Sequence, residues 1–364
     1  MLHFKKSKVF LPLLTVLSLL LGMMSCQKKE GQGTENQVVE EKKDSAKVVN
    51  LYSQRHYASD DSLYKIFEER TGIKVNVVKA SADELMNKME MEGADSPADL
   101  FITADAGRLQ RAKMKGLLQP LVSETLNSQV PAYLRDADNQ WFALTTRARV
   151  IVFDKKKHNL DSTFNYENLA DAKWKGKLLI RSSENPYNQS LMASILASSG
   201  EEAAEKWAKG VVANMAREPK GGDRDQIKAI AAGEGEIAVV NSYYLAQMLK
   251  DQDEEVRKAA EMVGVCFPNQ SNRGTHINIS GAGIAKNAPN LENARLLLEF
   301  LTSAEAQATY ANSECEFPLI EGSDITKNHP ILKDWNFKAD KENLQKLGEF
   351  QEKAILLFDK VMWK

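Results

Sequence analysis

The sequence predicts an α/β fold of two lobes, each a mixed, mostly parallel sheet flanked by helices, with a two-strand hinge between them. Three observations predict it. Short β-branched runs alternate with amphipathic segments along the chain. About 317 residues remain from position 48 onward, enough for two lobes of ordinary size. Two long apolar strands, near 147–154 and 276–286, are placed to pair as the hinge about which the lobes would close.

The first lobe is expected to begin with three strand–helix units. Its strands are VVNLYS (48–53), KVNVVKA (74–80) and ADLFIT (98–103). A capping box of Ser81 and Glu84 starts the second helix, and Gly72 and Gly116 end the first and third. This β-α-β-α-β-α order predicts a parallel sheet whose ligand crevice lies at the carboxyl ends of its strands.

The remaining elements complete both lobes. Further strands are expected at 177–182, 236–241 and 263–269, and helices at 188–199, 201–213, 224–232, 290–302 and 304–312, before a helical tail. The resulting domain boundaries assign 48–147 plus 275–318 to the N-lobe and 148–274 plus 319–364 to the C-lobe.

The first 26 residues have the features of an export signal. Three lysines precede an apolar run at 9–24 that is too short and too close to the terminus for a spanning helix. The sequence MMSC resembles a bacterial lipobox, with Met23 where Leu is common, and predicts lipidation of Cys26. An ordinary secretory signal is the alternative, and both predict export from the cytoplasm. Residues 27–47 are polar and charged, as expected of a flexible tether.

The composition of the chain limits the classes of molecule that it is expected to bind. A hydrophobic content of 43% supports real cores, and a net charge of −2 without a basic stripe argues against a nucleic-acid partner. Cys266 and Cys315 could form a disulfide in an oxidising compartment or remain two buried thiols. Their separation, without CxxC or HxxxH spacing, provides no zinc signature.

Four tyrosines and one histidine stand where predicted strands end or helices begin. They are His56 and Tyr57 in SQRHY, Tyr187 in ENPYNQS, and Tyr243 and Tyr244 in NSYYLA. Loops at the carboxyl ends of strands present ligands in such sheets, and closure of the lobes could bring all five groups together. Hard anionic oxygen suits hard cations, imidazole suits iron, and tyrosinate is itself an iron ligand. The set therefore points to a ferric-iron site.

Plainer interpretations exist for each residue. A pair of adjacent tyrosines is expected by chance about 0.2 times in such a chain, so the pair could also be two ordinary tyrosines packed in the core. At a helix start, however, neighbours diverge by only about 100° and can share a target, with Asn241 or Ser242 as the cap. His56 could be a surface residue. No Ser/Cys-His-Asp arrangement supports a hydrolase, and neither GxxxxGK[ST] nor GxGxxG is present.

Longer motifs add a family resemblance over nearly all of 48–364. They are NLYSQRHYASD, TGIKVNVV with ADEL and SPADLFITADAGRL, RSSENPYNQS, IAVVNSYYLA and PNQSNRGTHINISGAGI. In these the chain resembles the periplasmic ferric-iron-binding proteins of ABC import systems, a tyrosine-rich branch of the class II two-lobe solute-binding proteins. The resemblance implies that the imidazole of His56 and the phenols of Tyr57, Tyr187, Tyr243 and Tyr244 bind the metal.

One position departs from another branch of that family, in which an acidic residue follows the third strand and an outside anion completes the metal shell. Here the position holds Ala104, with Asp105 as the helix cap, which favours a shell made by the protein alone. Arg55, Arg147 and Arg181 are candidate hydrogen-bond donors to the phenolates.

The resemblance thus implies a lipid-anchored, extracytoplasmic binding protein that captures Fe(3+), with Fe(2+) as the alternative ion. It would be a monomer, held by its N-terminal lipid at a bacterial membrane, and would deliver iron to an ABC permease without acting as an enzyme. The alternative hypothesis keeps the two-lobe fold and changes the ligand to another small solute, such as an organic anion or a polyamine.

Overall fold

The computed structural model describes residues 47–342 and 344–364. The predicted export signal, Cys26 and the tether up to residue 46 lie outside the described residues. Within the described ranges, no helix is both long enough and apolar enough to cross a membrane.

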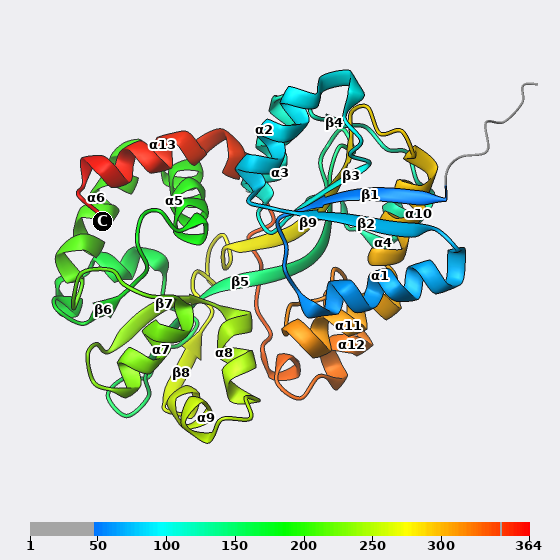
Figure 1. Cartoon of the computed structure of the whole chain (residues 1–364). Helices are drawn as coiled ribbons and strands as arrows, with labels where there is room; N and C mark the ends of the chain where they lie inside the picture. Colours follow the sequence, from blue (N-terminus) through cyan, green and yellow to red (C-terminus); the bar gives the residue numbers. More distant parts are fainter. Residues whose placement is uncertain (1–46, 343) are drawn as a thin grey trace, which may run out of the picture. The chain divides into compact units, whose positions relative to one another are not determined.

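Three parallel strands open the fold, as predicted. Strand β1 (Val48–Ser53) lies between β2 (Lys74–Lys79) and β3 (Leu100–Thr103). The helices that follow them are α1 (Ala58–Thr71), α2 (Ala82–Glu92) and α3 (Ala106–Met114), seen in Figure 1. Gly72 ends α1 with a φ of 70°, in the left-handed region that favours glycine, and Ser81 and Glu84 form the predicted capping box.

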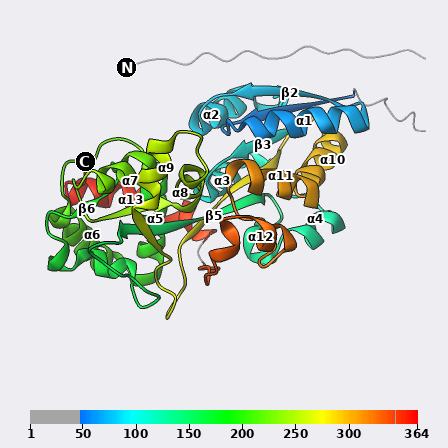
Figure 2. The same ribbon diagram turned by 90° about the horizontal axis from the view of Figure 1, so that it is seen from below.

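The two long strands that were predicted to pair do so. Strand β5 (Phe142–Asp154) runs antiparallel to β9 (Ile277–Ala285), and its second half pairs with β7 (Ile237–Asn241) and β8 (Val263–Cys266). The sheet order is β2-β1-β3-β9-β5-β7-β6. Figure 2 shows β5 passing from the side that carries α5 to α9 to the side that carries α10 to α12. The prediction started this strand at residue 147, too late, because pairing with β9 extends it back to Phe142.

The second half of the chain is built on β7 (Ile237–Asn241), which is antiparallel to β5 and parallel to β6 (Leu178–Leu179). Strand β8 (Val263–Cys266) pairs with β5. The predicted strand at 177–182 is too long, since only two of its residues pair with β7. The helices of this half are α5 (Pro186–Ser199), α6 (Glu201–Asn214), α7 (Asp223–Ala231), α8 (Ser242–Leu249) and α9 (Glu254–Glu261).

Helix α5 starts two residues earlier than predicted. Pro186 takes a position in its first turn, where the missing N–H costs nothing, and the Asn185 side chain accepts a hydrogen bond from the backbone N–H of Tyr187 at 3.1 Å. Tyr187 therefore lies in the first turn of a helix and not in the loop before it.

Shorter elements complete the described chain. They are β4 (Leu118–Gln119), α4 (Glu124–Gln129), α10 (Leu291–Leu301), α11 (Ala304–Glu314), α12 (Asp324–Asn328), α13 (Lys346–Lys360) and the 3₁₀ turns Gly93–Asp95, Ala132–Leu134, Tyr166–Ala170, Ala172–Trp174 and Leu332–Asp334. Helix α13 packs against both α5 and α3, although these were predicted to belong to different lobes. The exact lobe boundaries stay a prediction.

The two cysteines are free thiols. Cys266 and Cys315 are both buried and unbridged, so the disulfide alternative is not realised. Burial raises the pKa of the Cys266 thiol to about 12, and its Sγ donates to the carbonyl of Asp161. At neutral pH this thiol is protonated and behaves as a small apolar side chain.

Candidate metal centre

Tyr243 and Tyr244 occupy the first turn of α8, directly after β7. Their ring centroids lie 4.2 Å apart at an interplanar angle of 37°. The hydroxyl of Tyr243 donates to the hydroxyl of Tyr187 at 3.1 Å. The starts of α5 and α8 therefore converge, and three of the predicted phenols meet there.

Asn241 is the N-cap residue of α8, as one of the two predicted alternatives had it, but no side-chain capping hydrogen bond forms. Its amide oxygen instead accepts from the Arg149 guanidinium at 3.2 Å, and the Ser242 hydroxyl accepts from the backbone N–H of Ala148 at 3.2 Å. Both oxygens therefore accept hydrogen bonds from strand β5 and are not available to cap the helix.

Tyr57 is a fourth phenol within electrostatic range of phenols at the starts of α5 and α8. It ends the loop after β1 and is half-buried, and its hydroxyl donates to Oε1 of Glu316 at 3.0 Å. Burial and the Glu316 carboxylate raise the pKa of Tyr57 well above its usual value, against the guanidinium charges of Arg147 and Arg55. The charge of Tyr187 also acts on Tyr57, so the two phenols lie within electrostatic range.

The phenols act on one another's ionisation. Burial raises the pKa of Tyr243 well above its usual value, and the charges of Tyr187, Tyr57 and Tyr244 raise it further. Burial and the neighbouring Tyr187 raise the pKa of Tyr244 to about 12. Members of all three predicted segments thus form one electrostatic cluster. The phenols of Tyr57, Tyr243 and Tyr244 are protonated at neutral pH in the metal-free protein, and a metal ion would have to displace their protons.

His56 does not join this cluster in the structure. It is exposed on the loop that carries Tyr57, and within residues 47–342 and 344–364 no hydrogen bond links it to any of the four phenols. The described residues contain no group of three or more His, Cys, Asp or Glu side chains that could hold a metal ion. A metal at this place would therefore depend on the tyrosines.

All three predicted arginines lie beside the phenols. The guanidinium carbon of Arg147 and that of Arg181 are each 5.7 Å from the ring centroid of Tyr187, and that of Arg55 is 5.1 Å from the ring of Tyr57. Arg147 is buried and donates to the backbone carbonyl of Ala104. Against the larger opposing effect of burial, the charges of Arg147 and Arg55 act to lower the pKa of Tyr57, and that of Arg147 acts to lower the pKa of Tyr243.

Two charged residues near the phenols were not found from the sequence. Arg149 is buried, bonds to Asp223 and Asn188 at 2.8 Å each, and lies 5.9 Å from the Tyr187 ring centroid. Glu316 is fully buried beneath Tyr57. Each of these charged residues has apolar neighbours in the sequence, in RARVIVFD and CEFPL. A charge in an apolar segment is expected to be buried and to need a specific partner, so this pattern could have identified both residues.

A small cavity adjoins the Tyr187 ring. It is lined by Arg147, Arg149, Tyr187, Asn241, His276 and Asn278, which come from β5, α5, β7 and β9. Burial and the nearby guanidiniums lower the pKa of His276 to about 3, so this imidazole is neutral. The cavity brings hydrogen-bonding groups from both hinge strands against one phenol.

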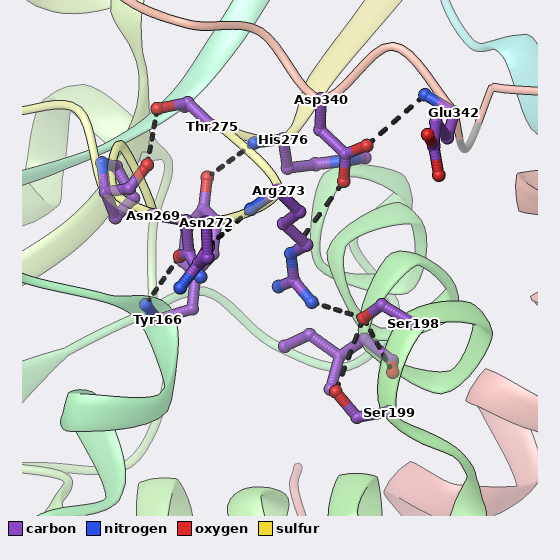
Figure 3. A network of polar contacts seen from close by, with 12 residues as sticks. Tyr166, Ser198, Ser199, Asn269, Asn272, Arg273, Thr275, His276, Asp340 and Glu342 are labelled. Carbon is purple, nitrogen blue, oxygen red and sulfur yellow. Dashed lines mark hydrogen bonds and ion pairs between the residues drawn. The ribbon is translucent and has the colours of Figure 1, made fainter.

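A network of polar contacts on the loop before β9 connects that loop to the end of α5 (Figure 3). Arg273 donates to the hydroxyl of Ser198 at the end of α5, and its Nε lies 3.8 Å from the carboxylate of Asp340. The Tyr166 hydroxyl accepts from the backbone N–H of His276 at 3.2 Å. The helix that presents Tyr187 is thereby tied to the start of a hinge strand.

Comparison with known families now decides the class of protein. The family described as bacterial extracellular solute-binding protein matches residues 95–340. The chain belongs to that family. Iron uptake proteins A1 and A2 of Synechocystis are 46% and 43% identical to this solute-binding protein over 316 and 322 residues, which are 87% and 88% of this chain and 87% and 91% of those relatives.

Solved structures agree with the sequence relatives. The FutA (IdiA) protein of Trichodesmium, in complex with iron and citrate ligands, superposes with a TM-score of 0.80 at 47% identity, covering 87% of this chain and 100% of that one. The ferric binding protein from Campylobacter jejuni superposes with a TM-score of 0.79 at 43% identity, over 87% and 100% of the two chains. The predicted two-lobe class II fold and the resemblance to ferric-binding proteins are confirmed.

Proposed function

We propose that this solute-binding protein captures ferric iron between its two lobes and delivers it to an ABC permease. The ligands would be His56, Tyr57, Tyr187, Tyr243 and Tyr244. Relatives that are 43% to 46% identical are named iron uptake proteins, and a structural relative was solved with iron and citrate. Ferric rather than ferrous ion is the cargo, because phenolate oxygen is a hard ligand.

The convergence of the phenols is the observation that supports this proposal most. The hydroxyls of Tyr187 and Tyr243 lie 3.1 Å apart, Tyr244 stacks beside Tyr243, and Tyr57 interacts with both Tyr187 and Tyr243 through charge. Buried phenols ordinarily seek separate partners. Here they face one another, with guanidinium groups around them, and a trivalent cation would replace their protons and neutralise the charge of the phenolates so formed.

The exposed His56 would join the metal shell when the lobes close. It precedes Tyr57 directly and is exposed, so its side chain can change rotamer without movement of the loop. Imidazole is a good iron ligand and needs no proton displaced when it is neutral. Closure on the cargo would then produce the form that docks on the permease.

Lipidation at Cys26 would keep the carrier at the membrane face. A single mature chain, tethered by residues 27–47, would work as a monomer in the bacterial envelope. Mass spectrometry of the protein from its membrane fraction tests this: Cys26→Ser should abolish the lipid adduct and release the protein into the soluble fraction. An unmodified N-terminus in the natural protein would refute the anchor.

The colour of the iron-loaded protein tests the metal site. Metal-free protein titrated with ferric citrate should develop a visible absorption band from phenolate-to-iron charge transfer and bind one ion per chain. The Y243F/Y244F double variant should lose the band and most of the affinity. Tyr133→Phe is the matched control, because Tyr133 donates to Glu321 away from the cluster and its loss should leave the band unchanged. A colourless loaded protein contradicts the proposal.

A further inference from the structure

The carboxylate of Glu316 holds the phenol of Tyr57. Glu316 is fully buried, and its Oε1 accepts the hydrogen bond from the Tyr57 hydroxyl at 3.0 Å. Its other oxygen, Oε2, accepts from the hydroxyl of Thr145 on β5. A hydrogen bond to a charged acceptor is about twice as strong as one between neutral groups. Tyr57 is thus the only one of the four phenols whose recorded hydrogen-bond acceptor, within the described residues, is a carboxylate.

The backbone of Glu316 is fixed to the hinge. The next residue, Phe317, exchanges two backbone hydrogen bonds with Thr146 of β5, at 3.0 and 2.8 Å. Together with the bond from Thr145, this places the carboxylate rigidly against the hinge strand. If the phenol moved toward a metal ion, Glu316 could follow it only by giving up its own hydrogen bond from Thr145.

The loop of Tyr57 is held to the same segment at two further points. Arg55 donates to the hydroxyl of Tyr310 in α11 at 2.7 Å, and the Ser59 hydroxyl donates to Glu314 at 2.6 Å. These contacts flank Tyr57 and do not involve its phenol. The loop can stay in place while the Tyr57 side chain alone changes partner.

A phenol oxygen cannot serve Glu316 and a metal ion in the same way. Once the oxygen bonds to the cation its proton must have left for an acceptor, which in this proposal is solvent water, and the hydrogen bond that Tyr57 donated to Glu316 no longer exists. The phenolate and the carboxylate would then be two anions in contact, which is unfavourable in a buried place. The metal and Glu316 compete for the same oxygen.

We propose that Glu316 is a latch on Tyr57: it holds the phenol in the metal-free protein, competes with the bound cation for the phenol oxygen, and so sets how readily iron is released. This inference rests on the proposed function. Glu316 is a positioning residue, since it acts on the metal through Tyr57.

Glu316→Gln provides the main test. The amide occupies the same volume but accepts a weaker hydrogen bond and carries no charge, so ferric iron should bind about tenfold more tightly and dissociate correspondingly more slowly. Affinity is measured by competition with citrate, and release by stopped-flow transfer to a chelator. Glu305→Gln, which removes a carboxylate of α11 that pairs with Arg70, is the control and should change neither quantity. Unchanged or weaker iron binding by E316Q overturns the latch.

A double-mutant cycle shows whether the effect passes through Tyr57. In a Y57F background the phenol oxygen is missing, so adding E316Q should change iron release no further. An equal change in both backgrounds means that Glu316 acts on the site in some other way and rejects the proposal. Glu316→Asp keeps the charge near Arg147 but withdraws the carboxylate, and should also slow release, which covers the case in which E316Q folds poorly.

Iron-free protein offers a separate readout. With tyrosine labelled by ¹³C at Cζ, the Tyr57 resonance is assigned by its absence in Y57F. It should shift in E316Q by more than the resonances of Tyr187, Tyr243 and Tyr244. An unmoved Tyr57 resonance shows that Glu316 does not hold the phenol. If wild-type protein takes up no ferric iron, the proposed function fails; if it does, and E316Q releases iron at the same rate, only the latch fails.

Discussion

The two sides of the candidate site differ in how far they are assembled before a metal arrives. On one side Tyr187, Tyr243 and Tyr244 stand at the starts of α5 and α8 and already touch one another. On the other side Tyr57 is bonded away to Glu316, and His56 is exposed. Under the proposed function, this difference predicts that the first side would receive the cation and the second side would close on it.

Buried charge explains why the first side is preformed. Arg149 links β5 to Asp223 of α7 and to Asn188 of α5, and its guanidinium lies near the Tyr187 ring. These bonds and the one from Arg149 to Asn241 hold the first turns of α5 and α8 close together without a bound ligand. On the other side, the Tyr57 phenol is held to the sheet by a single hydrogen bond to Glu316, and His56 is exposed, so these two side chains can adjust more easily.

The largest effect is expected from breaking the bonds of Arg149. Arg149→Met leaves the Asp223 carboxylate buried without its main partner and should lower the free energy of unfolding by about 3–5 kcal/mol. Denaturant unfolding of the metal-free protein measures it. A loss as small as that of an exposed pair would mean that the preformed side does not depend on Arg149.

The second largest effect should follow loss of a preformed phenol. Tyr187→Phe removes one ligand oxygen and leaves the Tyr243 hydroxyl without its acceptor, so the affinity for ferric iron should fall by about 100-fold. Tyr57→Phe should cost less, about tenfold, because the wild-type phenol must first leave Glu316. Competition titrations compare the two variants. Equal losses would erase the distinction between the two sides.

The number of protons released when ferric iron binds should be lower by about one in the Y57F variant than in the wild-type protein. The raised pKa values of Tyr57, Tyr243 and Tyr244 mean that these phenols bind protons at neutral pH, so uptake of the cation releases protons and weakens as the pH falls. The slope of log affinity against pH between about 6 and 8 should be smaller by about one in Y57F than in wild type. An unaltered slope would show that Tyr57 does not bind the metal as phenolate.

The smallest effect serves as the reference for the others. Arg70 and Glu305 form an exposed ion pair with an N–O distance of 2.6 Å, and this ion pair involves none of the four phenols. Arg70→Met should leave both the unfolding free energy and the iron affinity within measurement error, because water screens exposed pairs. A clear loss of iron binding in this variant would show that long-range charge, and not the local cluster, controls the site.

Much of this protein could be read from its sequence because short-range patterns carry the information. The strands β1, β2 and β7, the capping box of Ser81 and Glu84, and the glycine that ends α1 each depend on neighbouring residues only. The predicted phenols could be named because each follows a strand or opens a helix. The length of β5 and the brevity of β6 could not, since only pairing with distant strands determines them.

The tertiary structure alone decided which groups meet. Asn241 turns from the helix it could cap to Arg149, two thiols that could have bridged stay apart, and Glu316 reaches back across 259 positions to Tyr57. The sequence determined which side chains are available and in which local geometry they start. Their partners depend on burial, because a buried charge or hydroxyl bonds to whatever the fold places beside it, and no local pattern encodes that neighbour.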